Sequence, residues 1–344
     1  MPARPSVVIV YNEPGQDRYS ALGEQKAVLG VLDEVKAVNA ALIKLGSPAV
    51  RMGLAPPLEQ VQERLAAISP DWVVFNLFEG FEGRPETEAA VAGMLAELGL
   101  AYTGCPPAAL ALALDKAKTK AILEANALPT PRFQVMTPDS VPAFQLRYPC
   151  IVKPVAEDAS HGLSEDSVVA NAAALEKQVR KISEQYSGHA LVEEFLDGRE
   201  YNITVLGNRE PFALPSSEIV FTLAPGRPRI LTFWAKWEPR SAYYKSSAPV
   251  CPADVDDLTR QRIATSAVAA YKLLGCAGYA RVDFRASADG IPQIIEVNPN
   301  PDLTPGYGVA MQAEAAGMSY PQVIDRILEF ALERKSFASQ SAPA

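Results

Sequence analysis

Two short apolar stretches late in the chain carry polar side chains whose types and spacing suit a metal and phosphate site. Residues 280–284 contain Arg281 and Asp283, and residues 294–298 contain Glu296 and Asn298. Side chains two residues apart lie on one face of a strand. If both stretches are strands and pair, two carboxylates, an amide oxygen and a guanidinium meet. Such oxygen ligands suit Mg²⁺, which proteins hold through one or two carboxylates while substrate phosphates complete its coordination. The pattern therefore predicts a nucleotide bound through metal.

The same residues also have a simpler interpretation. Arg281 and Asp283 can form an ion pair on the face of one strand, and Glu296 can merely precede the turn that follows Asn298. Carboxylates near strand ends are common, and a short motif can match by chance. These residues alone leave both interpretations open.

Length and composition limit the class of protein. A chain of 344 residues exceeds one hydrophobic core, so two or three compact units are expected. The net charge of -8 argues against a general nucleic-acid binder. The first apolar run is too short for a signal peptide and no later run is long enough to span a membrane, which predicts a cytoplasmic protein without a membrane partner. Four scattered cysteines and two histidines indicate neither a zinc site nor a disulfide framework.

The first third of the chain has an α/β pattern, in which strands and helices alternate. Strands are expected over residues 6–11, 72–77 and 99–104, and helices over about 20–45, 58–68 and 87–98. In open α/β sheets, ligands bind beyond the carboxyl ends of the strands. Glu13 and Glu79 lie at such ends and are candidate substrate contacts. The alternative for each is a solvated loop position.

Lysines further along the chain can supply the local basic site that an anionic ligand needs. Lys116, Lys118 and Lys120 open a helix, where alternate lysines usually mean a solvated face. Lys153 ends an apolar strand over residues 149–154. A buried ammonium group is costly without a negative partner, and a phosphate would supply one.

A strand, a turn and a second strand follow a helix over residues 172–185. Around this turn, Glu193, Phe195, Leu196 and Glu200 offer apolar walls and hydrogen-bond acceptors of the kind that a purine and a ribose need. The alternative is a turn without a ligand.

The segment over residues 222–248 has no clear periodicity, is rich in aromatic side chains and lies between prolines. We call it the lid segment, because a long irregular stretch inside a compact domain is usually a lid or is disordered. It is predicted to be mobile without ligand. Helices are expected over about 255–274 and 319–334, and the Ser/Ala-rich residues 335–344 are expected to be a disordered tail.

Together these residues resemble the ATP-grasp superfamily and, within it, the D-alanine–D-alanine ligase family. The resemblance covers about residues 70–332. Its most specific parts are residues 98–104, 115–120, 128–131, 152–154, 192–200, 251–253, 281–284 and 296–298.

The resemblance implies the ATP-grasp fold, with an open α/β domain followed by two α+β lobes that clasp ATP. The implied boundaries are 1–114 for the N-terminal domain, 115–196 for the central lobe and 197–334 for the C-terminal lobe with the metal site and lid. The tail would follow over 335–344.

The resemblance also implies roles for individual residues. For the nucleotide, Lys116 and Lys153 would contact the phosphates, Glu193, Phe195 and Leu196 would frame the adenine, and Glu200 would bind the ribose. Asp283, Glu296 and Asn298 would hold two magnesium ions, with Mn²⁺ as an alternative metal. For catalysis the residues are Arg281, which would steady the transferred phosphoryl group, Lys236, which would lie over the γ-phosphate, and Ser160 of the pair Ala159-Ser160.

The chain departs from the family pattern on the amino-acid side. Asp302 and Tyr307 stand where the family has glycine and serine, and the glycine turn and HG motif of the first domain are replaced by residues 12–15 and 78–80. Glu13, Glu79, Asp302 and Tyr307 are therefore candidate contacts for an altered substrate.

The resulting prediction is an ATP-dependent ligase that joins a carboxylate to an amine through an acyl phosphate, with altered amino-acid specificity. Its partners would be small molecules such as amino acids or a short peptide, and a homodimer is a further expectation. One alternative is an authentic D-alanine–D-alanine ligase of peptidoglycan precursor synthesis. Another is a non-catalytic nucleotide-binding protein.

Overall fold

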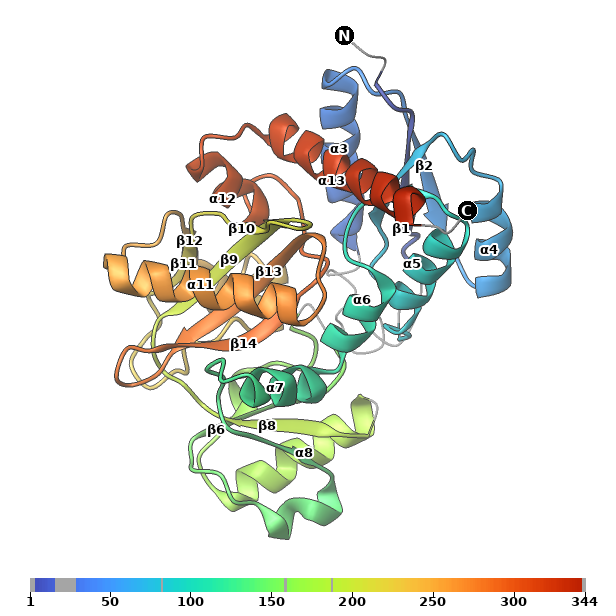
Figure 1. Cartoon of the computed structure of the whole chain (residues 1–344). Helices are drawn as coiled ribbons and strands as arrows, with labels where there is room; N and C mark the ends of the chain where they lie inside the picture. Colours follow the sequence, from blue (N-terminus) through green and yellow to red (C-terminus); the bar gives the residue numbers. More distant parts are fainter. Residues whose placement is uncertain (1–3, 16–28, 82, 158–159, 187, 342–344) are drawn as a thin grey trace.

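Three β-sheets organise the chain in the computed structural model, which describes residues 4–15, 29–81, 83–157, 160–186 and 188–341 (Figure 1). The sheets follow one another along the sequence, since their strands come from residues 7–102, 133–194 and 200–298. No helix of the described residues is long and apolar enough to cross a membrane.

The first sheet is parallel and has the strand order β2-β1-β3-β4. A parallel sheet needs crossover connections, which here are helical and cover its faces. The strands are β1 (Val7–Asn12), β2 (Ala49–Leu54), β3 (Val73–Leu77) and β4 (Ala101–Tyr102), and the helices are α3 (Val31–Lys44), α4 (Leu58–Ala66), α5 (Thr87–Glu97) and α6 (Pro107–Leu114).

The sequence did not reveal β2, because β2 is the edge strand and its apolar pattern is broken. Arg51 is exposed, and Gly53 has no side chain to contribute. Helix α3 begins at Val31 with Gly30 as its N-cap, later than the start expected near residue 20, and residues 16–28 lie outside the described part of the chain.

The second sheet is antiparallel, has the order β5-β8-β6-β7 and carries α8 on one side, below the rest of the molecule in Figure 1. Two helices begin with side-chain caps: Asp115 accepts from the Lys118 backbone N–H and Asn171 from that of Ala174. The elements are α7 (Lys116–Ala125), β5 (Phe133–Met136), β6 (Cys150–Pro154), β7 (Val168–Val169), α8 (Ala172–Gln185), β8 (Ala190–Glu194) and two 3₁₀ helices (Pro138–Ala143 and Glu165–Ser167).

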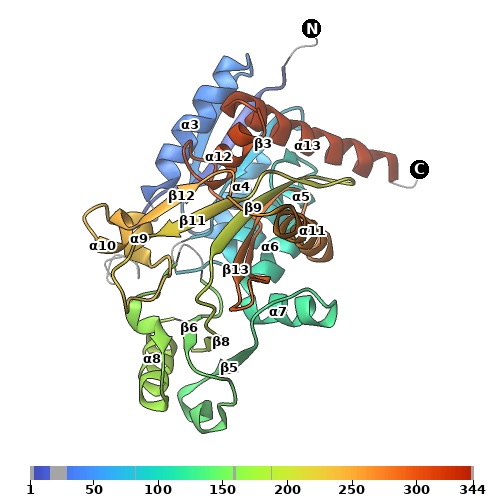
Figure 2. The same cartoon turned by 90° about the vertical axis from the view of Figure 1, so that its left-hand side faces the viewer.

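The third sheet has the order β12-β11-β9-β13-β14, and β10 also pairs with β9. The lid segment contains α9 and α10, which lie beside β11 and β12 at one side of this sheet (Figure 2). The elements are β9 (Glu200–Gly207), β10 (Phe212–Ala213), β11 (Ser217–Phe221), α9 (Phe233–Trp237), α10 (Ala242–Lys245), β12 (Ser247–Val250), α11 (Asp257–Leu273), β13 (Gly278–Ala286), β14 (Pro292–Asn298) and α12 (Gly308–Ala315).

The last helix, α13 (Tyr320–Ser341), returns to the first sheet and packs against α3 and β4 (Figure 1). Its buried Ile324 and Ile327 share a hydrophobic cluster with Val7 and Ile9 of β1. The expectation of a disordered tail from residue 335 is wrong for residues 335–341, which continue the helix, and residues 342–344 lie outside the described part. A Ser/Ala-rich composition does not oppose a helix, because alanine has the highest helix propensity.

Candidate functional site

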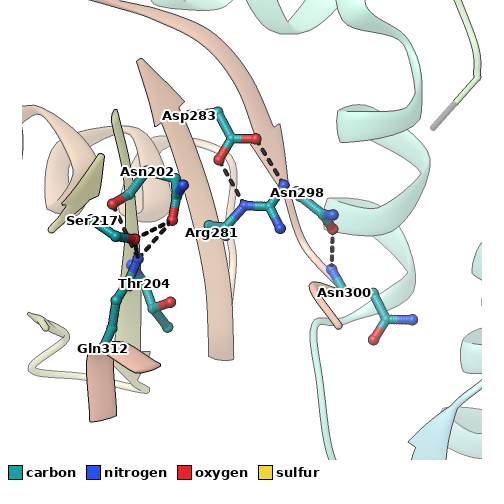
Figure 3. Close-up of polar contacts among 8 residues, drawn as sticks. All are labelled: Asn202, Thr204, Ser217, Arg281, Asp283, Asn298, Asn300 and Gln312. Atoms are coloured by element: carbon teal, nitrogen blue, oxygen red, sulfur yellow. Dashed lines mark hydrogen bonds and ion pairs between the residues drawn. The ribbon is translucent and has the colours of Figure 1, made fainter. Parts of the chain in front are cut away.

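The pairing of β13 with β14 brings the predicted metal and phosphate residues together. In the antiparallel register, Arg281 stands opposite Asn298 and Asp283 opposite Glu296. Figure 3 shows the Arg281 guanidinium turned towards Asp283, with Asn298 on the next strand. The guanidinium donates from Nε to Oδ1 of Asp283 over 2.7 Å and from a terminal nitrogen to Oδ2 over 2.8 Å. The ion pair of the simpler interpretation is therefore present, but it is only part of a larger arrangement.

Glu296 does more than precede a turn, since it lies among cationic side chains. Its Oε1 is 2.8 Å from the Lys116 ammonium group. Burial alone would raise the pKa of the Glu296 carboxyl, but the charges of Lys116, Lys153 and Lys236 lower it to about 2. Glu296 is therefore ionised at neutral pH, as a metal ligand must be.

Lys236 of α9 reaches the same charged group from the lid segment. Burial lowers the pKa of Lys236 and so does the charge of Arg281, while Glu296 and Asp283 oppose that shift. For Arg281 the balance is reversed: burial works against the charge, yet Asp283 raises the pKa of the guanidinium. Strand β13, strand β14 and the lid segment thus meet at one cluster of mixed charge.

The donor set on β13 and β14 fits magnesium. Asp283 and Glu296 supply carboxylate oxygens, and each ionised carboxylate has lone pairs beyond those used by Arg281 and Lys116. The Asn298 amide is oriented, because its Oδ1 accepts the backbone N–H of Asn300 over 2.9 Å (Figure 3). Among the described residues, no group of three or more His, Cys, Asp or Glu side chains could hold a metal ion. Few protein carboxylates are needed where phosphates complete the coordination.

The lysines at the start of α7 do not form the solvated face that their spacing usually indicates. Lys116 and Lys120 are buried, whereas the Lys118 side chain is 73% exposed. The helix period turns Lys116 and Lys120, four residues apart, to one side. Lys116 also donates to the backbone carbonyl of Glu157 over 2.6 Å.

Glu193 is a buried carboxylate held between two ammonium groups. Its two oxygens lie 2.5 Å from Nζ of Lys120 and 2.5 Å from Nζ of Lys153. Burial would raise the pKa of Glu193, and these two lysines lower it below its usual value. Two ammonium groups and one carboxylate have a net positive charge, so the neighbourhood of Lys153 suits an anion.

The turn between β8 and β9 is held against β13 by a close backbone approach. A Cβ atom added to Gly198 would stand 2.1 Å from the carbonyl oxygen of Ala286, so only glycine fits. Next to it, the Ala286 N–H donates to the Arg199 carbonyl over 2.8 Å. The predicted nucleotide residues Phe195 and Leu196 precede this turn and are half-buried, and Glu200 follows it and is buried.

Within the described residues, no hydrogen bond or ion pair joins the predicted catalytic residue Ser160 to the charged cluster. Its backbone has φ +62°, and its carbonyl accepts the N–H of Leu163 over 3.1 Å. A non-glycine residue in this left-handed region is uncommon and, when present, often lies at a functional site. Ala159 lies outside the described residues.

Asp302 interacts electrostatically with Arg281 of the charged cluster, and Glu79 acts on Glu34, a carboxylate that the sequence did not single out. Burial first, and then the charges of Asp302 and Glu79, raise the pKa of buried Glu34. The charge of Asp302 also contributes to the raised pKa of Arg281. Burial and then Tyr244 and Asp302 raise the pKa of Tyr307. Asp302 and Glu79 therefore supply negative charge around Glu34.

The loop that carries Asp302 and Tyr307 is fixed at both ends. Glu34 accepts the Leu303 N–H over 2.8 Å. At the other end, α12 is anchored by buried Gln312, whose amide nitrogen donates to Asn202 and Ser217 and whose Oε1 accepts the Thr204 N–H (Figure 3). The exposed side chain of Glu13 lies against Gly53 of β2.

Sequence reasoning missed Lys120, Glu34 and Arg285. Each carried a weak signal. Lys120 repeats Lys116 at helix spacing, and Glu34 is a carboxylate among the apolar positions Val31, Val35 and Val38. Arg285 continues the alternation of Arg281 and Asp283 along β13, so it lies on the same face.

Comparison with known proteins gives a consistent result. A family profile described as "D-ala D-ala ligase C-terminus" matches residues 122–329. A D-alanine–D-alanine ligase of Bordetella petrii is 33% identical over 294 residues, which are 84% of this chain and 83% of that protein.

Solved structures are similar over nearly the whole chain. The structure of D-alanine–D-alanine ligase from Bacillus anthracis complexed with ATP aligns with a TM-score of 0.73 at 20% identity, covering 97% of this chain and 99% of that one. VanG D-Ala:D-Ser ligase from Enterococcus faecalis aligns with a TM-score of 0.73 at 20% identity, covering 95% and 99%.

Proposed function

The chain belongs to the D-alanine–D-alanine ligase family and has its ATP-grasp fold, and from this premise we propose that it is an ATP-dependent ligase that joins a carboxylate to an amine. The proposed products are an amide or peptide, ADP and phosphate. The similarity to solved D-alanine–D-alanine ligase structures confirms the prediction of an ATP-grasp fold.

One observation carries the proposal: the mixed charge cluster formed by β13, β14, α7 and the lid segment. The Lys116 ammonium group lies 2.8 Å from Glu296, and the Arg281 guanidinium holds Asp283 over 2.7 and 2.8 Å. Lys236 lies within the field of the same carboxylates. Cations next to carboxylates can bind both the phosphates of a nucleoside triphosphate and its metal ion. A site with only cations, or only carboxylates, would not bind both.

These side chains account for the first chemical step. A carboxylate is a poor acylating agent, and transfer of the γ-phosphoryl group makes it an acyl phosphate. Lys116 and Lys153 would orient the phosphates, and Lys236 and Arg281 would stabilise the charge on the transferred group. When bound, magnesium ions held by Asp283, Glu296 and Asn298 would supply further charge neutralisation. The amine then attacks the acyl phosphate and phosphate leaves, while the lid segment excludes water.

The amine substrate is proposed to differ from free D-alanine. VanG is described as a D-Ala:D-Ser ligase, so this fold accommodates more than one amine. In the present chain the charges of Asp302 and Glu79 act together on buried Glu34, so these two carboxylates place negative charge on this side of the site. An amine without an adjacent carboxylate, or an amino acid with a second basic group, fits that charge better than free D-alanine does.

The sequence also allows two other functions. An authentic D-alanine–D-alanine ligase would need the carboxylate of the second D-alanine to be bound next to Asp302. A non-catalytic protein would have less reason to keep Arg281, Asp283 and Glu296 together, because charges withdrawn from water are costly. The ligase with altered specificity is therefore preferred.

A screen of amino acids and dipeptides tests the proposed function. With ATP and Mg²⁺ present, one carboxylate and amine pair is expected to stimulate phosphate release above the rate without substrates. Mass spectrometry should then show a product equal to the two substrates minus water. If the chain binds ATP, but no substrate pair stimulates phosphate release and no condensed product forms, the chain would instead be the non-catalytic binding protein.

Replacing Lys153 by alanine is expected to weaken ATP binding about tenfold to a hundredfold, which corresponds to one lost hydrogen bond to a charged group. The reason is that Lys153 supplies part of the positive charge left over beside Glu193. Calorimetric titration with ATP and Mg²⁺ measures the change. Lys118→Ala, at an exposed position of α7, is the control and should bind ATP normally. Unchanged affinity in Lys153→Ala would show that this lysine does not contact phosphate.

A further inference from the structure

Arg285 is a buried arginine for which the family resemblance implies no role. It stands at the end of β13, two residues after Asp283, and its register partner on β9 is Glu200. The guanidinium donates to Oε2 of Glu200 over 2.8 Å, and the two side chains are 6% and 11% exposed. A cation is therefore buried beside the carboxylate proposed to bind ribose.

Further contacts lock the Arg285 side chain in place. A second terminal nitrogen donates to the backbone carbonyl of Arg229, near the start of the lid segment. The guanidinium carbon lies 5.3 Å from the ring centre of Phe195 and 5.8 Å from that of Phe221. Arg229 is itself held, since its Nε donates to Oδ1 of Asp197 over 3.1 Å. A side chain fixed by packing and by bonds on two sides can hold its partner in one position.

The charge of Arg285 opposes the effect of burial on Glu200. Burial raises the pKa of the Glu200 carboxyl, and Arg285 is the strongest influence in the opposite direction. The bond from Arg285 uses Oε2, so Oε1 remains available to accept from hydroxyl groups. An ionised acceptor makes stronger hydrogen bonds to hydroxyl groups than a neutral one does.

We propose that Arg285 is a positioning residue for nucleotide recognition: it holds Glu200 in one place and leaves Oε1 of Glu200 to accept hydrogen bonds from the ribose hydroxyls. This inference rests on the proposed function, because it takes ATP as the ligand. Arg285 does not itself need to touch the nucleotide.

The test compares the binding of ATP with that of 2′,3′-dideoxy-ATP, which lacks both ribose hydroxyls. Titration calorimetry with Mg²⁺ gives both dissociation constants. The wild-type chain is expected to bind ATP at least about tenfold more tightly, as hydrogen bonds to a charged acceptor allow. In Arg285→Met, which retains apolar bulk against Phe195 and Phe221, ATP binding should weaken and the ratio should fall towards one. Arg285→Lys keeps a charged donor and should recover part of the ratio.

A matched control exists on the neighbouring residue of the same turn. Arg199 also pairs with a glutamate, Glu218, bonds a backbone carbonyl, that of Asp254, and stacks on an aromatic ring, that of Tyr201. Arg199→Met should leave the ratio of the dissociation constants of dideoxy-ATP and ATP unchanged.

Equal weakening of the binding of both nucleotides in Arg285→Met, with that ratio preserved, would show a merely structural role and overturn this inference alone. Wild-type protein that binds ATP and dideoxy-ATP equally would also overturn it while leaving ligase activity possible. A wild-type chain that binds neither nucleotide would overturn both this inference and the proposed function.

Discussion

Replacing Glu296 by glutamine is expected to lower the rate of ATP-dependent ligation by about a hundredfold or more while the protein stays folded. Metal-assisted charge stabilisation contributes several kcal/mol to a reaction of this type, and each 1.4 kcal/mol is a factor of about ten in rate. Glutamine has nearly the volume of glutamate and still offers an oxygen to Lys116, but it brings no negative charge to the metal. The measurement is the rate of phosphate release, with the best substrate pair from the screen, across a range of Mg²⁺ concentrations.

The controls separate a metal effect from a folding effect. Glu176→Gln removes one carboxylate from an exposed ion pair with Arg180 on α8 and should leave turnover unchanged. The Glu296 variant should show the far-ultraviolet circular dichroism of the wild type. It should also bind ATP without magnesium at least as well, because a negative charge near the phosphates has been removed. Normal turnover with normal magnesium dependence in Glu296→Gln would show that β13 and β14 do not form the metal site.

Free D-alanine is expected to be a poor acceptor for the wild-type chain, and replacing Asp302 by asparagine is expected to improve it by up to several hundredfold. Two like charges at about 4 Å repel by about 4 kcal/mol at an effective dielectric constant of 20, which sets the upper limit of the effect. Asparagine removes the charge yet keeps the side-chain oxygen that accepts the Thr304 N–H over 2.7 Å. The loop should therefore keep its conformation.

The measurement is the KM for D-alanine as acceptor, from the rate of formation of D-alanyl-D-alanine. Asp139→Asn, in the 3₁₀ helix of the central lobe, is the control and should not change that KM. Efficient formation of D-alanyl-D-alanine by the wild-type chain at millimolar substrate would contradict the altered acceptor site. The chain would then be a D-alanine–D-alanine ligase in the ordinary sense.

Much of the fold and part of the candidate site could be predicted from local patterns. The strands that carry Arg281, Asp283, Glu296 and Asn298 were recognised because a period of two places such residues on one face, whatever the rest of the chain does. The helix over residues 172–185 was also predicted with its observed bounds, and in the structure Asn171 caps it while Leu175, Val179 and Ile182 are buried at helix spacing. The edge strand β2 was missed because an edge strand is half exposed and needs no regular apolar pattern.

The sequence by itself determined which residues could do the chemistry, because residue type and spacing within one element are properties of the local chain. It did not determine which charged side chains lie next to each other. Lys120 and Lys153 share Glu193, Arg285 holds Glu200, and Glu34 lies beside Asp302, yet the members of each group come from different elements. Only strand register and the packing of the lobes decide those distances. In a buried site the charge of a group depends on its neighbours at a few ångströms, so tertiary structure alone decided which carboxylates stay ionised and which side of the site attracts a cation.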